Sequence, residues 1–233
     1  MTTATVLKKL ITFFLFIAFL LLAAASVKII CEKWQDHHID GDKLFFTALE
    51  ECKRWESYRY TLSSELILNN GAKTKTVLRG EQDQEGNMHL FGEIMDTEME
   101  AYQFGDDHYR FISASQKWKR MTDSPLSDNG VLRMVIEPKR NFEFSDTISV
   151  DYEGTVREDG EKYYRFTVVP KEGFHIADTY FTDFKYRIDI HSETKQITNA
   201  LITTVSRTKG ENKLTCAVHF FDINEDFLLK PPM

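Results

Sequence analysis

Short runs of alternating apolar and polar residues, separated by turn signals, dominate the sequence from Tyr58 onward. Three such signals divide the part between Tyr58 and Trp118: Asn69-Asn70-Gly71, Glu85-Gly86-Asn87 and Gly105-Asp106-Asp107. The same pattern returns from Ile148 to Ile223. Side chains of a β-strand alternate between its two faces, and Gly, Asn and Asp favour the tight turns that join antiparallel strands. The pattern therefore predicts one continuous antiparallel sheet of many strands.

The strands are expected at residues 58–63, 73–82, 86–95, 97–104, 107–113, 117–121, 148–157, 161–169, 184–190, 195–206 and 212–223. The segment 86–95 has apolar residues on both faces, for example Leu90 and Phe91, so we expect it to be covered on both sides or to line a cavity. In the segment 148–157 we expect one face to carry the residues Ile148, Val150, Tyr152, Gly154 and Val156. Aromatic anchors are expected at Tyr102, Tyr109, Phe111 and Trp118.

Two helices interrupt this pattern. Asp40 or Asp42 can cap a helix that runs to about Ser57, and its apolar residues form a stripe along one side. A shorter apolar helix is expected between Ser127 and Pro138, inserted between the two groups of strands. We expect both helices to lie on the sheet, with their apolar sides facing it.

Residues 1–31 differ from the rest. Lys8 and Lys9 precede an apolar stretch that carries no charge until Lys28. It fits a signal peptide cleaved near Ala23-Ala24-Ala25, and it also fits an uncleaved anchor, because residues 10–30 can span a bilayer of about 30 Å. The apolar residues beyond the alanines favour the anchor. A lipidated Cys31 is a third interpretation, but small residues do not precede it.

Each interpretation keeps the N-terminus inside and residues 32–233 outside the cytoplasm, because the basic flank stays on the cytoplasmic side. Residues 32–41 are then a tether, and residues 42–233 form the folded domain. Without Lys8 and Lys9 the chain has 27 basic and 36 acidic residues, a net charge of about −9. This charge argues against nucleic acid as a partner and against simple electrostatic binding to anionic lipid.

No motif in the sequence specifies a reaction or a metal site. His37 and His38 lie on the extended tether, where neighbouring side chains point apart. The segment Asp222–Asp226 lacks the glycine and the later glutamate of a calcium loop. Ser192 and Lys195 have the spacing of an acyl-enzyme motif, but they lie between two strand patterns and are expected in a hairpin turn. We therefore expect a protein that is not an enzyme, with no catalytic residue, no metal and no cofactor.

The order of features resembles one known group of proteins. An apolar N-terminal segment and an amphipathic helix lead into Trp55-Glu-Ser-Tyr-Arg-Tyr60, and the strands carry Gly105-Asp-Asp-His-Tyr109 and Gln116-Lys-Trp118. After the short apolar helix come Tyr186-Arg-Ile-Asp-Ile190 and Phe221-Asp-Ile-Asn-Glu-Asp-Phe227. Over residues 40–232 this pattern is similar to the LolA/LppX-type lipoprotein-carrier superfamily, in particular to its extracytoplasmic members in Gram-positive bacteria.

The resemblance implies an α+β fold, in which a curved antiparallel sheet forms an unclosed half-barrel with helices covering its concave face. It also implies a membrane-held, extracytoplasmic domain that binds a lipid or lipopeptide between sheet and helices, or a signalling module that contacts a membrane protein. The residues expected to line the cavity are Phe45, Leu49, Leu90, Ile94, Tyr109, Leu132, Val135 and Ile136. An anchored chain cannot shuttle freely, which argues against transport more than against binding.

Overall fold

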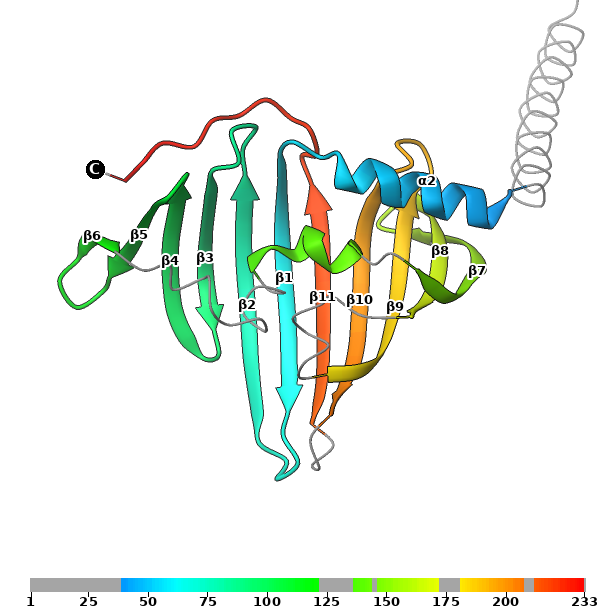
Figure 1. Cartoon of the computed structure of the whole chain (residues 1–233), viewed down its shortest axis with the longest axis horizontal. Helices are drawn as coiled ribbons and strands as arrows, with labels where there is room; N and C mark the ends of the chain where they lie inside the picture. Colours follow the sequence, from blue (N-terminus) through cyan, green and yellow to red (C-terminus); the bar gives the residue numbers. More distant parts are fainter. Residues whose placement is uncertain (1–38, 122–135, 144–145, 172–180, 208–211, 233) are drawn as a thin grey trace, which may run out of the picture. The chain divides into compact units, whose positions relative to one another are not determined.

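The computed structural model describes residues 39–121, 136–143, 146–171, 181–207 and 212–232. Within these residues, eleven antiparallel strands form one sheet in the order β6-β5-β4-β3-β2-β1-β11-β10-β9-β8-β7 (Figure 1). Their bounds are β1 Tyr58–Ile67, β2 Lys73–Gln82, β3 Met88–Ile94, β4 Thr97–Phe104, β5 Asp107–Ile112, β6 Lys117–Met121, β7 Thr147–Glu158, β8 Glu161–Pro170, β9 Phe181–His191, β10 Ile197–Ser206 and β11 Lys213–Phe221. The predicted antiparallel sheet is confirmed.

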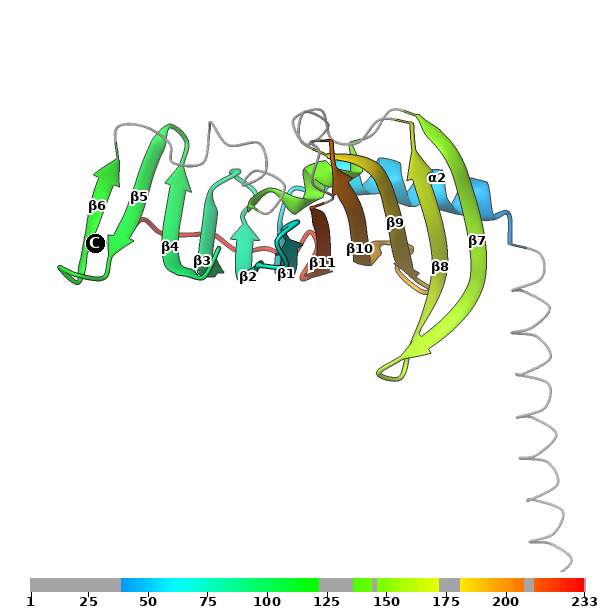
Figure 2. The same ribbon diagram turned by 90° about the horizontal axis from the view of Figure 1, so that it is seen from below.

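Two meanders make up this sheet. Strands β1 to β6 follow one another in space, as do β7 to β11, and the two groups join where β1 pairs with β11. Strands β6 and β7 lie at the two edges, so the sheet is open, and Figure 2 shows β7, β8 and β9 bending strongly. The architecture is that of an open half-barrel.

The helix α2 (Gly41–Lys53) begins where the sequence predicts but ends four residues earlier than Ser57. Its buried residues are Phe45, Ala48, Leu49 and Cys52, a spacing of three and four that places them on one side of the helix. This side packs on the sheet, with contacts to β7 and β10. No helix among the described residues has both the length and the apolar character needed to cross a membrane.

A second helical element, the 3₁₀ helix η1 (Pro138–Phe142), lies on the same face of the sheet as α2 (Figure 1). The sequence did not predict this element. The apolar helix expected between Ser127 and Pro138 lies almost entirely outside the described residues. We call the face that carries α2 and η1 the helix-bearing face. It includes Tyr60 and Leu62 of β1, whereas Arg59 and Thr61 lie on the other face, which we call the outer face.

Aromatic side chains pack between the two helices and the sheet. Phe220 of β11 is the centre, with ring centroids 5.1 Å from Trp55 and 5.9 Å from Phe142. The hydroxyl of the buried Tyr60 donates a hydrogen bond of 2.6 Å to the carbonyl oxygen of Ile136, just before η1. A buried carbonyl needs such a partner, so this bond fixes the start of η1 above β1.

Strand β7 corrects one prediction about faces. Ile148 is 71% exposed, and Gly154 pairs with Arg165 on the outer face, whereas Tyr152 pairs with Phe166 on the helix-bearing face. The register shifts between Thr147 and Ser149 and again between Tyr152 and Gly154. Each β-bulge inserts one residue and thereby reverses the alternation that follows it. The expectation that all five alternate residues from Ile148 to Val156 share one face is wrong for this reason.

The apolar pattern also changes sides towards the β6 edge. On β1 to β3 and β8 to β11, most of the buried apolar residues point to the helix-bearing face. On β5 and β6 the aromatic residues Tyr109, Phe111 and Trp118 instead lie on the outer face, because Tyr109 pairs with Tyr102 and Tyr102 pairs with His89. This end of the sheet therefore has an aromatic outer face.

Candidate functional site

Five of the residues predicted to line a cavity lie together on the helix-bearing side of the sheet. Phe45 and Leu49 project from α2, and Ile136 precedes η1. Leu90 and Ile94 of β3 share this face, because Leu90 pairs with Gly80, which pairs with Tyr60. All five are at most 7% exposed. Between the sheet and its helices they form part of an almost continuous apolar layer.

Tyr109 does not join this group. Its ring lies on the outer face, where it packs 6.4 Å from the ring of Phe104. Leu132 and Val135 lie outside the described residues. The position of Tyr109 could have been found by counting residues outward from the turn at Gly105 and Asp106, because a two-residue turn places Tyr102 opposite Tyr109.

Four buried titratable side chains on the helix-bearing face, two cysteines and two tyrosines, are held in their neutral form. Burial raises the pKa of the Cys52 thiol and of the Cys216 thiol to about 12 each. Both cysteines are free and buried. Burial likewise raises the pKa of Tyr58 and of Tyr60 above the ordinary range of tyrosine. Protonated, buried thiols are poor nucleophiles, so this face is suited to apolar contact rather than to nucleophilic chemistry.

A polar network crosses four strands on the outer face. Glu81 accepts a hydrogen bond from Arg59 at 3.0 Å and lies 3.0 Å from Nδ1 of His89. Nε2 of His89 is 3.2 Å from a carboxylate oxygen of Glu100, and its ring stacks on Tyr102 at 3.9 Å. The hydrogen bond with His89, followed by that from Arg59, lowers the pKa of Glu81. The network ties β1 to β4 together on this face.

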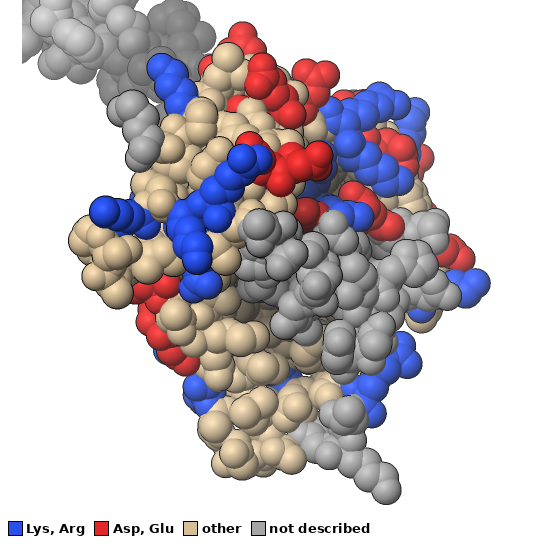
Figure 3. All heavy atoms as spheres, turned by 60° about the vertical axis from the view of Figure 1, so that its left-hand side comes forward, with Lys and Arg blue, Asp and Glu red and all other residues tan. Residues whose placement is uncertain are grey.

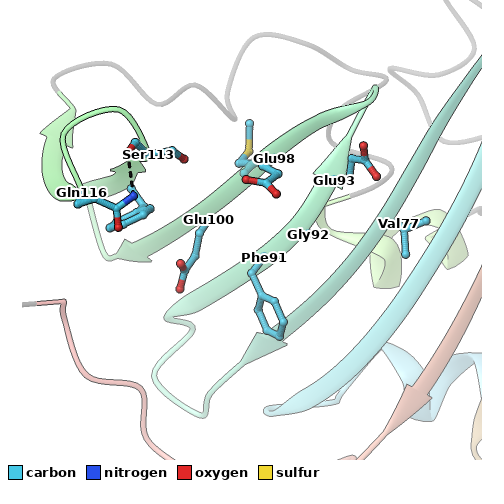
Figure 4. A pocket seen from close by; sticks show the side chains of 10 residues that line it. Val77, Phe91, Gly92, Glu93, Glu98, Glu100, Ser113 and Gln116 are labelled. Carbon is cyan, nitrogen blue, oxygen red and sulfur yellow. Dashed lines mark hydrogen bonds between the residues drawn. The ribbon is translucent and has the colours of Figure 1, made fainter.

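Two hollows lie on the outer face of the described sheet. One has a volume of about 440 Å³ and a floor of short side chains from β1, β10 and β11, with Arg79 and Arg187 among its lining residues. Arg165 also lines it but is neutralised by a bidentate pair with Asp189, both bonds measuring 2.7 Å. The other hollow, of about 600 Å³, lies over β2 to β5 and extends to the turn that follows β5 (Figure 4).

The motifs that the sequence analysis rejected have structural roles. Ser192 and Lys195 lie in the hairpin turn between β9 and β10, as predicted, and Nζ of Lys195 donates to the carbonyl oxygen of Ser192. Asp222 pairs with Arg59, and the side chain of Asn224 accepts a hydrogen bond from the amide of Glu56. In the described part of the chain no three His, Cys, Asp or Glu side chains are grouped so as to hold a metal ion.

No family model matches the sequence, and no curated protein sequence does. Its structure does have relatives among solved structures. The lipoprotein LppX of Mycobacterium tuberculosis superposes with a TM-score of 0.51 at 11% identity, covering 81% of this chain and 97% of LppX. LprF of Mycobacterium bovis superposes with a TM-score of 0.51 at 10% identity, covering 83% of this chain and 97% of LprF.

A third solved structure, the LolA superfamily protein NE2245 of Nitrosomonas europaea, aligns with a TM-score of 0.38 at 12% identity, covering 82% of this chain and 96% of NE2245. The fold of the chain is of the LolA/LppX type, as the order of its sequence features predicted. At this level of identity the likeness establishes the fold and leaves the ligand to be argued from the chain's own residues.

Proposed function

We propose that this chain is a membrane-associated, extracytoplasmic domain that binds a lipid or lipopeptide and is not an enzyme. The observation that carries the proposal is the open half-barrel, with an apolar layer between its sheet and the helices α2 and η1. The likeness of this fold to the lipoprotein LppX supports it. Acyl chains need an apolar, water-excluding surface and few polar partners, which this layer supplies.

The ligand would lie against the buried residues Phe45, Leu49, Leu90, Ile94 and Ile136, and Leu132 and Val135 are proposed to complete its lining. Tyr109 is left out because it lies on the outer face. Residues 1–31 would hold the domain at the membrane, or direct its secretion if they are cleaved, and residues 32–41 would act as the tether.

Native mass spectrometry of residues 32–233 tests this proposal, because Gly41–Met233 forms one compact unit. The protein is purified from a bacterial host and measured before and after extraction with organic solvent. We expect an adduct with the mass of a lipid that disappears on extraction and returns when lipid is added back. An unmodified mass in every preparation, with no uptake of added lipid, would reject the lipid ligand.

Two matched variants locate the ligand. Ile94→Thr places a hydroxyl on the helix-bearing face, whereas Val77→Thr introduces the same hydroxyl at a residue that is 53% exposed on the outer face. We expect Ile94→Thr to reduce the adduct and Val77→Thr to leave it unchanged. If both variants kept the lipid adduct to the same extent, the ligand would lie elsewhere on the protein.

A further inference from the structure

The outer face of strands β3 to β6 carries an aromatic surface that no described helix covers. Its members are His89, Phe91, Tyr102, Phe104, Tyr109, Phe111 and Trp118. Tyr102 is central, with ring centroids 3.9 Å from His89 and 5.2 Å from Trp118, and Phe111 lies 5.4 Å from Trp118. On an exposed sheet face such residues are usually polar, so an aromatic patch of this kind indicates a binding surface.

The hollow of about 600 Å³ opens into this surface (Figure 4). Its apolar lining is Val77, Phe91, Met99 and Phe111, and Phe91 is 39% exposed. Gly92 forms part of its floor. With φ of +142°, a Cβ there would lie 2.2 Å from the carbonyl oxygen of Val77, so only glycine fits. The close approach of β2 and β3 beside the hollow therefore depends on this glycine.

Carboxylates surround the same hollow. Glu93, Glu98 and Glu100 all line it, and no lysine or arginine is among the described residues of its lining. Glu93 and Glu98 stand directly opposite each other on β3 and β4, and neither has an ion-pair partner in the described part of the protein. Like charges in opposite positions destabilise a pair of strands. The repulsion between these two carboxylates therefore lowers the stability of the folded protein, and a positively charged ligand would remove this repulsion.

The charge around the hollow is a local feature. Figure 3 shows acidic and basic side chains interspersed over the side of the molecule that it presents. On the aromatic surface itself, Arg120 is paired with Asp107. A ligand that matches the hollow must therefore bring its positive charge close to the three glutamates, while its apolar part lies on Phe91 and Phe111. Lysine and arginine side chains combine these two properties, because their apolar stems pack on rings and their charged ends reach carboxylates.

We propose that this aromatic surface is a docking site for an extended segment of a partner protein that carries lysine or arginine. The segment lies across β3 and β4, places one basic side chain in the hollow between Phe91 and the glutamates, and covers the neighbouring rings. A bilayer with anionic headgroups does not fit, because the glutamates would repel it. The proposal does not rest on lipid binding, since the docking site and the apolar layer lie on opposite faces of the sheet.

The test measures peptide binding to the full-length chain in dodecylmaltoside. The probe is a fluorescein-labelled ten-residue peptide of alternating lysine and threonine, followed by fluorescence anisotropy, with empty micelles as the blank. We expect saturable binding that weakens with added salt, because the contact is electrostatic. A peptide of alternating glutamate and threonine should not bind. Absence of saturable binding by the lysine peptide would overturn the proposal.

The double variant Glu93→Gln/Glu98→Gln separates a binding role from a structural one. It removes the opposed charges, so we expect its melting temperature to equal or exceed that of the wild type. Its affinity for the lysine peptide should fall about fivefold, the effect of losing two partly exposed charge pairs. Phe91→Thr should weaken binding because it removes the ring, while threonine, a β-branched residue, still suits the strand.

The matched control is Glu193→Gln/Glu225→Gln. It removes the same two negative charges at exposed positions, one in the turn after β9 and one in the segment after β11. We expect this variant to bind the peptide like the wild type. An equal loss of affinity in both double variants would show that only net charge matters, and the proposed site would be wrong.

Discussion

Among single residues, Glu81 has the clearest pH-dependent role. It bridges Arg59 of β1 and His89 of β3 from its position on β2, and it is less than one quarter exposed. Because these partners lower its pKa, the folded protein favours the ionised carboxylate more than the unfolded chain does. The resulting stability is fully present above the ordinary pKa of 4.5 and is lost as the pH falls through the lower folded value.

We therefore expect Glu81→Gln to lower the free energy of unfolding by about 1 kcal/mol at pH 7. The difference from the wild type should shrink as the pH falls below 4.5. Urea unfolding at several pH values measures it. The control is Glu65→Gln, which removes a more exposed pair with Lys73 and should change stability by less than about 0.5 kcal/mol. A difference independent of pH would contradict the role of the charged form.

At the scale of elements, substitutions in the helix α2 measure how much the packing of this helix on the sheet stabilises the fold. Phe45 and Phe46 are neighbours in the sequence but differ in burial, since Phe45 is fully buried and Phe46 is 45% exposed. The ring of Phe45 packs 5.7 Å from that of Phe166 on β8. The periodicity of the helix thus turns one of two identical residues to the sheet and the other towards solvent.

We expect Phe45→Ala to destabilise the fold by about 3–5 kcal/mol, because it removes a buried ring and leaves a cavity. Phe46→Ala, with the same loss of atoms, should cost about 0.5 kcal/mol or less. Thermal and urea unfolding of both variants provide the measurement. Similar losses in the two variants would mean that α2 does not pack on the sheet through the side that contains Phe45.

The same elements show how much the sequence predicts. Turn residues and alternation placed the strands to within a few residues, because both signals are local. The bulges in β7 left no such signal, since Ile148 and Gly154 continue the alternation in the sequence and change face only in the sheet. Of the residues predicted to line a cavity, Phe45 and Leu90 lie on the helix-bearing side, whereas Tyr109 lies on the outer face. Its aromatic character alone did not indicate its face. The outer hollow depends on pairing between strands and was not predicted.

For the whole molecule, stability should be distributed unevenly across the sheet. Strand β11 lies between β1 and β10 and buries alternate residues, whereas β6, at the edge of the described sheet, has β5 as its one described neighbour and contains no buried residue. Backbone amides in such edges open without unfolding the rest of the protein.

Hydrogen exchange followed by mass spectrometry should reveal this gradient. We expect amides of β6 to exchange at least about a hundredfold faster than those of β11, with β7 intermediate because its ladder with β8 is long. Binding of the lysine peptide to the aromatic surface should slow exchange in β3 and β4 and leave β9 unchanged. Uniform exchange across the sheet would contradict the unequal distribution.

The pairing of β1 with β11 also has a consequence for biosynthesis. Tyr60 of β1 lies opposite Phe220 of β11. During synthesis β1 leaves the ribosome long before β11, so the sheet cannot be completed until β11 has been made. Until β11 arrives, β1 and β10 each have an unpaired edge, and such edges recruit strands from other chains. A chain that stops before Lys213 keeps both edges permanently exposed. Pairing of β11 therefore decides whether a newly made chain completes its sheet or keeps two edges that favour aggregation.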